Sequence, residues 1–187
     1  MKKIIKKIKI SDIIIATVLI LIGASFRLFP HLPNFTPIAA IALFAGVYLS
    51  KKIAILVPIS AMVISDIFIG YYEPSLMISV YASFFICVLL GFWLKNHKKW
   101  YLFLGGSIMA SSVFFLLTNF AVWILTPWYA KTFIGLVQCY LMAIPFLRNT
   151  LLGDLSYVVI FFGAYEIAIF LAKKKFGVIK TIFVSTK

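Results

Sequence analysis

The chain alternates between long apolar stretches and short segments that are basic or rich in proline. An apolar stretch of about 20 residues can cross a membrane as a helix, because the hydrocarbon core is roughly 30 Å thick. The pattern therefore predicts an all-α membrane protein with six transmembrane helices, folded as a single integral membrane domain over residues 1–187. The predicted spans are residues 12–29, 37–50, 53–70, 75–94, 100–124 and 151–172.

Proline positions separate the first two spans. The segment from Phe29 to Asn34 is too rich in proline to be helical. Thr36 is expected to cap the second helix, with Pro37 at its first position. The first helix follows a basic segment, as the apolar part of a signal peptide would. We expect this helix to stay uncleaved, because no small-x-small motif precedes a soluble domain and further spans follow.

Composition and charge indicate the class of protein and its orientation in the membrane. The chain is 64% hydrophobic and 12% charged, with a mean hydropathy of +1.10, which excludes a soluble globule. Of the 18 Lys and Arg residues, 15 lie in clusters between or beyond the spans. These are Lys2, Lys3, Lys6, Lys7, Lys9, Lys51, Lys52, Lys95, Lys98, Lys99, Lys173, Lys174, Lys175, Lys180 and Lys187. The positive-inside rule places such clusters in the cytoplasm, so we expect a multi-pass protein of the cell inner (plasma) membrane with both termini cytoplasmic. We attribute the net charge of +13 to the cytoplasmic rim of the protein, next to anionic lipid headgroups. We therefore expect no nucleic acid as a partner.

The segment before the last span departs from the pattern. Its apolar run, Phe133–Phe146, has about 14 residues, which is short for a crossing. A seventh crossing would also place the lysines at 173–175 on the outer side. We therefore interpret residues 133–146 as an extra outer-face helical segment, either interfacial or re-entrant. Asn149 or Thr150 is expected to cap the last span.

Polar residues gather in the outer third of the predicted bundle. Each has a structural explanation: Arg148 can neutralise Asp154 or Asp66, and Asn119 can bond a neighbouring helix. Together, however, polar groups from several segments predict an outward-facing cavity that binds a small molecule. The candidate substrate-binding residues are Arg27, His31, Asn34, Asp66, Asn119, Trp123, Arg148, Asn149 and Asp154.

Catalytic and nucleotide-binding motifs are missing from the sequence. It has no P-loop, no HExxH, no GxSxG with Asp and His partners, and no Cys/His cluster. We therefore expect no catalytic residues, no metal, no cofactor and no enzymatic activity. The alternative is an integral-membrane enzyme or binding protein that acts on a lipid at the outer leaflet. It would use Asp66, Asp154 or Glu73 as acid or base and Arg148 as an anion clamp.

Three strings resemble a family of small bacterial integral membrane proteins described only as candidate transport proteins. The strings are residues 27–46, RLFPHLPNFTPIAAIALFAG; residues 117–123, LTNFAVW; and residues 144–154, IPFLRNTLLGD. More distantly, the chain is similar in size and topology to the substrate-binding (S) components of energy-coupling-factor (ECF) transporters. That resemblance implies an S-component-like bundle that captures a vitamin- or micronutrient-like molecule from the outer face. It also implies a membrane energy-coupling subunit and ATPases as partners, in addition to the lipid bilayer around the helices.

Docking of such a partner needs a surface of small residues. S components often carry an Ala-xxx-Ala motif in their first helix, whereas the first helix here offers only Ala16, Gly23 and Ala24. In the second helix, Ala42 and Gly46 form a small-xxx-small pair that allows close helix approach. This pair is either the docking surface for the partner or a contact inside the protein's own bundle.

Overall fold

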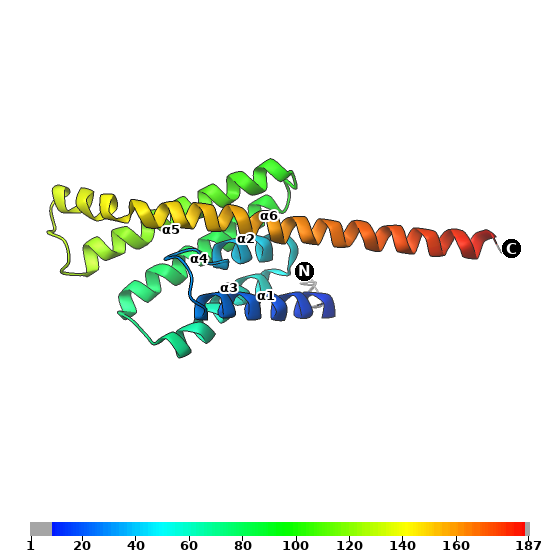
Figure 1. Cartoon of the computed structure of the whole chain (residues 1–187), viewed down its shortest axis with the longest axis horizontal. Helices are drawn as coiled ribbons and strands as arrows, with labels where there is room; N and C mark the ends of the chain where they lie inside the picture. The colour runs from blue at the N-terminus through cyan, green and yellow to red at the C-terminus, as the bar shows by residue number, and fades with distance from the viewer. Residues whose placement is uncertain (1–8, 186–187) are drawn as a thin grey trace, which may run out of the picture.

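The protein is all-helical over residues 9–185, the part that the structure, a computed structural model, describes (Figure 1). Lys2, Lys3, Lys6, Lys7 and Lys187 lie outside the described residues. The helices are α1 Ile10–Leu28, α2 Ile38–Tyr48, α3 Lys51–Ile69, α4 Pro74–Leu94, α5 Trp100–Leu125 and α6 Phe133–Ser185. The predicted all-α fold is confirmed, and the first five helices match the predicted spans to within two residues at either end.

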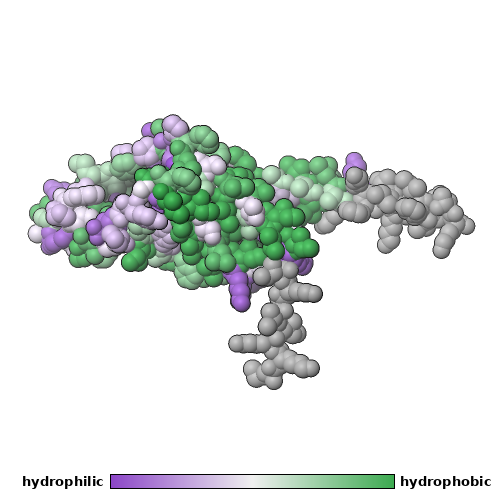
Figure 2. All heavy atoms as spheres, turned by 90° about the horizontal axis from the view of Figure 1, so that it is seen from below, coloured by the Kyte–Doolittle hydropathy of each residue, from purple (hydrophilic) through white to green (hydrophobic). Residues whose placement is uncertain are grey.

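Five of these helices are long and apolar enough to cross a membrane, as expected for a multi-pass membrane protein. They are α1, α3, α4, α5 and the part of α6 from Phe133 to Ala172. Figure 2 shows the corresponding surface: apolar side chains cover the middle of the bundle, and polar side chains gather toward one end.

The short helix α2 forms the centre of the bundle. It has 11 residues, every residue from Ile38 to Val47 is buried, and it contacts all five other helices. At 1.5 Å per residue it is about 16 Å long, roughly half the thickness of a hydrocarbon core. The non-helical segment 29–37 precedes it and connects it to α1. This arrangement leaves room for a cavity at one end of the bundle.

Several basic clusters meet at the other end of the bundle, which we call the basic end. The backbone N–H of Ser50 donates to Asp12 Oδ2 (3.3 Å), and Lys95 Nζ donates to the carbonyl oxygen of Leu49 (3.2 Å). Lys98 Nζ lies 4.8 Å from the centre of the Tyr48 ring. The Tyr48 hydroxyl in turn donates to Glu166 Oε1 of α6 (2.7 Å). Lysines distant in the sequence are thus brought to one end. The opposite end of the bundle, where the segment 29–37 lies, is called the cavity end.

Ala42 and Gly46 lie in the core, so of the two alternatives predicted for this pair the docking surface is wrong and the contact inside the protein's own bundle is found. Ala42 is fully buried, and a Cβ atom on Gly46 would lie 2.5 Å from the carbonyl oxygen of Val88 and 2.8 Å from Cα of Gly91. The backbones of α2 and α4 therefore touch where these two glycines face each other. Small residues permit this close approach, as the sequence suggested, but within the protein's own bundle.

Helices α5 and α6 form a long antiparallel hairpin that extends past the other helices at the cavity end (Figure 1). Tyr140 donates to the carbonyl oxygen of Leu116 (2.8 Å), and Cys139 Sγ lies 3.4 Å from that of Asn119. Residues 133–146 are thus the first turns of α6, packed on α5. No helix begins at Asn149 or Thr150, contrary to prediction, although Pro145 lies inside α6.

The two expected cap residues make other contacts. Thr150 Oγ1 donates to the carbonyl oxygen of Phe146 one turn earlier (2.8 Å), which is compatible with a helix interior. Asn149 Nδ2 donates to the carbonyl oxygen of Pro33 (3.1 Å) in the segment 29–37. Packing of α5 along the whole of this region keeps α6 continuous where local sequence favours a helix start.

Candidate functional site

A cavity of about 480 Å³ lies at the end of the bundle opposite the basic end, near the start of the central helix α2. We call it the main cavity. It lies between α1, the segment 29–37, α3, α4 and α5. Its apolar wall includes Met62, Phe84 and Phe114. Its polar lining residues are Arg27, His31, Asn34, Thr36, Tyr72, Ser79 and Thr118. A volume of this size with mixed lining is typical of sites for small organic molecules.

Two smaller spaces adjoin the main cavity and share lining residues with it. A side cavity of about 220 Å³ reaches α6 and includes Asn119 and Thr150 in its wall. A recess of about 30 Å³ is lined by Asp154 and Ala39, and it shares Thr36 and Phe84 with the main cavity. Asn34 and Phe114 line all three spaces.

The segment 29–37 forms one wall of the site and is fixed against α6. Asn34 has a φ of 62°, in the left-handed region that asparagine tolerates better than most residues, which lets the chain turn there. The Phe35 ring lies 5.7 Å from that of Tyr157, and a Cβ atom on Gly153 would lie 3.3 Å from Phe35. With the bond from Asn149 to Pro33, these contacts hold the cavity wall in place.

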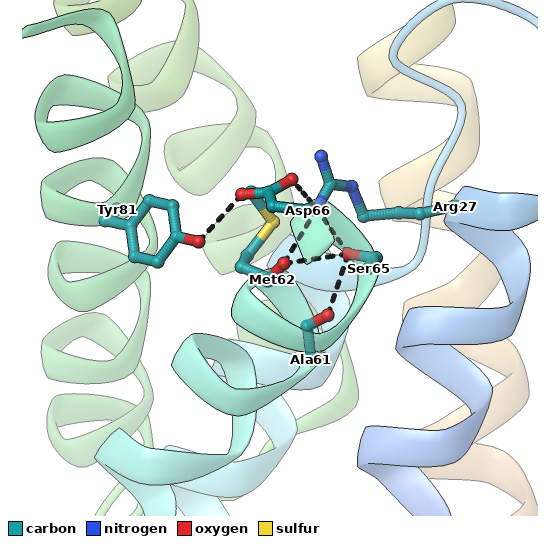
Figure 3. Close-up of polar contacts among 6 residues, drawn as sticks. All are labelled: Arg27, Ala61, Met62, Ser65, Asp66 and Tyr81. Atoms are coloured by element: carbon teal, nitrogen blue, oxygen red, sulfur yellow. Dashed lines mark hydrogen bonds and ion pairs between the residues drawn. The ribbon is translucent and has the colours of Figure 1, made fainter. Parts of the chain in front are cut away.

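A charged network forms the wall of the main cavity between α1, α3 and α4 (Figure 3). Arg27 Nη1 lies 2.7 Å from Asp66 Oδ1 and also donates to Ser65 Oγ. The Tyr81 hydroxyl donates to the second carboxylate oxygen of Asp66 at 2.7 Å. The Arg27 side chain is 15% exposed and that of Asp66 only 1%, so Arg27 separates the buried carboxylate from the cavity.

Asp154 is the second buried carboxylate and has a different environment. Only 2% of the residue is exposed, and its Oδ2 accepts a bond of 2.6 Å from the Ser111 hydroxyl. No cation pairs with Asp154 in the part of the chain that the structure describes. It lies at the wall of the recess, next to the N-terminal turn of α2.

The predicted site residues divide into three groups. Arg27, His31 and Asn34 line the main cavity, Asn119 lines the side cavity and Asp154 lines the recess. Asp66 and Asn149 lie behind the site, where one pairs with Arg27 and the other fixes the segment 29–37.

The third group lies away from the three spaces. Trp123 Nε1 donates to the carbonyl oxygen of Ala130 (2.9 Å), which joins α5 to the connection before α6. Arg148 is exposed on α6. The possible pairing of Arg148 with Asp66 or Asp154 is wrong, because Arg27 binds Asp66 and the partner of Asp154 is Ser111.

Sequence reasoning missed the hydroxyl residues of the site. Ser111, Phe114, Thr118 and Val122 follow one another at helical spacing along a single face of α5, which is the face toward the site. This periodicity was available as a signal, but hydroxyl groups inside an apolar helix are weaker indicators than charges. Among the described residues, no group of three or more His, Cys, Asp or Glu side chains could hold a metal ion.

The chain belongs to the family of unknown function DUF6580, which matches residues 7–179. No curated protein and no solved structure shows significant similarity to it.

Proposed function

We propose that this member of the DUF6580 family is the substrate-binding membrane subunit of a transporter, which captures a small organic molecule from the outer side of the membrane. The main cavity carries the proposal. Its volume of about 480 Å³ and its mixed polar and aromatic lining suit a vitamin- or micronutrient-sized ligand. A bundle that needed only stability would gain from filling this space, because packing defects in a core are destabilising.

The charge distribution supports the proposed orientation. Lys51 and Lys52 at the start of α3 and the lysines of the segment 95–99 lie at the basic end, whereas the main cavity lies at the opposite end. The positive-inside rule assigns the basic end to the cytoplasm, and the cavity then faces the outer side. This is the arrangement that the proposed resemblance to the S components of ECF transporters implies.

The proposal requires partners that supply energy. The sequence contains no ATP-binding signature, so a membrane energy-coupling subunit and ATPases are the proposed partners. Because Ala42 and Gly46 are buried, such a subunit would have to dock on another surface.

Native mass spectrometry of gently extracted protein tests the proposal. We expect a small organic molecule to co-purify with the wild-type protein. In Thr118→Phe, a ring from α5 would occupy the main and side cavities, and the bound molecule should be lost. Leu117→Phe is the matched control, because it places the same ring at a partly exposed neighbouring residue that lines neither cavity.

The identity of the bound species decides between functions. A water-soluble small molecule lost only in Thr118→Phe supports capture for transport. A phospholipid or a lipid fragment in the cavity would instead support the lipid-acting alternative. Equal binding by both variants would contradict the assignment of this cavity as the site.

A further inference from the structure

The two buried carboxylates at the cavity end, those of Asp66 and Asp154, have different bonding partners. Asp66 has a cation, Arg27, and a hydroxyl donor, Tyr81. Asp154 has one hydroxyl donor, Ser111, and no cation among the described residues. A buried carboxylate without a cation is costly, and it either takes up a proton or is compensated by a positive group that enters the site. The unmatched carboxylate borders a space that adjoins the proposed binding cavity.

The size of the recess limits what can reach Asp154. Its volume of about 30 Å³ suits one small polar group, since a single water-sized probe needs roughly 10–15 Å³. A ring or a longer chain would remain in the main cavity, whose volume is about 480 Å³. The geometry therefore favours a ligand with a small terminal group in the recess and a larger body outside it.

The walls of the recess favour an organic cation over a metal ion. Phe84 and Phe114 line it, and their rings stack with centroids 5.2 Å apart. Aromatic faces attract ammonium groups but supply no ligands to a hydrated metal ion. Amide and hydroxyl oxygens of Asn34, Thr36 and Thr150 complete the lining with acceptors for N–H groups.

We propose that Asp154 binds the ammonium group of a small organic amine whose body occupies the main cavity. This inference rests on the proposed function and narrows it to a class of substrate. The carboxylate would accept a charge-assisted hydrogen bond from the amine, while the Ser111 hydroxyl keeps its hydrogen bond to Asp154 Oδ2. Arg27, already neutralised by Asp66, would contribute no net positive charge that opposes the amine.

Three probes of similar size and different charge test this assignment: benzylamine, benzyl alcohol and benzoate. Binding is measured on the full chain in detergent by the shift in unfolding temperature and by calorimetric titration. We expect benzylamine to bind and the other two probes to bind at least about tenfold more weakly, the value of one charge-assisted hydrogen bond. Since this ranking needs only the wild-type protein, it does not depend on a variant that folds.

Variants then assign the selectivity to one residue. Asp154→Asn should weaken benzylamine binding by at least about tenfold and leave benzyl alcohol unaffected. Asp12→Asn makes the same chemical change at the basic end and should bind benzylamine as the wild type does. Benzylamine binding unchanged in Asp154→Asn, or benzoate as the best probe, would overturn the inference.

The co-purifying molecule gives an independent result. Its reaction with dansyl chloride identifies a primary or secondary amine, and a compound without an amine would overturn the inference even if Thr118→Phe removes it. In that case the proposed function stands and only the substrate class fails. If no compound co-purifies and no probe binds, the proposed function fails together with the inference.

Discussion

At the scale of single residues, the Arg27–Asp66 ion pair fixes the wall of the main cavity. The carboxylate of Asp66 is almost completely buried, and besides its ion pair with Arg27 it accepts a hydrogen bond from the Tyr81 hydroxyl of α4. Arg27 also donates to Ser65 and to the carbonyl oxygen of Met62. The end of α1 is therefore joined to α3 by bonds from one guanidinium group.

Arg27→Met should destabilise the protein by about 3 kcal/mol or more, because removing one partner leaves the buried charge of Asp66 uncompensated. Thermal unfolding of the purified protein measures the loss. Arg148→Met is the matched control, since Arg148 is exposed, and it should unfold at the wild-type temperature. Adding Asp66→Asn to Arg27→Met should recover part of the stability. Equal unfolding temperatures for Arg27→Met and Arg148→Met would contradict the structural role of the pair.

The sequence predicted which charged residues lie at the cavity end, but it could not assign their partners. Arg27, Asp66 and Asp154 were identified because charges inside spans are rare and costly. Whether Arg27 or Arg148 neutralises Asp66 depends on the rotation of each helix about its axis. Arg148 and Asn149 are adjacent in sequence, yet Arg148 is exposed and Asn149 bonds to Pro33. Packing between helices decides this rotation, and local pattern does not.

At the scale of elements, the close contact between α2 and α4 determines where the cavity can lie. Gly46 and Gly91 allow the short helix to sit against α4 with no side chain between the two backbones. Because α2 is short, the non-helical segment 29–37 lies between α1 and the start of α2, and its polar residues line the main cavity.

Gly46→Ala should impair folding, because the new Cβ atom would lie 2.5 Å from a backbone oxygen of α4 that cannot move independently. Overpacking of this kind costs about 1–3 kcal/mol or more. Gly105→Ala, also within a helix, meets no atom within 4 Å and should be tolerated or slightly stabilising. The comparison uses the yield of monodisperse protein and its unfolding temperature. A stable Gly46→Ala protein with ligand bound would show that α2 and α4 are less tightly packed than described.

Helix bounds were predictable where proline, glycine and lysine mark them, and not in α6. Pro37, Gly70, Pro74 and the lysines at 95–99 lie at or next to observed helix ends. In α6, the short apolar run Phe133–Phe146 and the cap-forming residues after it favoured two separate elements. The tertiary contacts with α5, from Tyr140 to Leu116 and from Asp154 to Ser111, join them into one helix. Such long-range packing overrides local preference.

At the scale of the whole molecule, the length of α6 raises the question of how the bundle sits in a membrane. The apolar part of this helix, Phe133–Ala172, has 40 residues and would be about 60 Å long. That is roughly twice the thickness of a hydrocarbon core. With Glu166 near the basic end, the first turns of α6 and the last turns of α5 lie beyond the ends of the other helices (Figure 1). We expect this part of the hairpin to lie in or above the outer interface.

Cysteine-accessibility labelling tests the orientation of the entire bundle. The background is Cys87→Ala/Cys139→Ala, in which the two native, buried cysteines are removed. A cysteine at Lys98, at the basic end, should react with a membrane-impermeant maleimide only after the cells are permeabilised. A cysteine at Lys131, in the connection between α5 and α6, should react in intact cells, because the hairpin tip is at the cavity end. Reaction of both cysteines from the same side would contradict the six-helix topology, and reaction in the reversed order would place the cavity in the cytoplasm and exclude capture from outside.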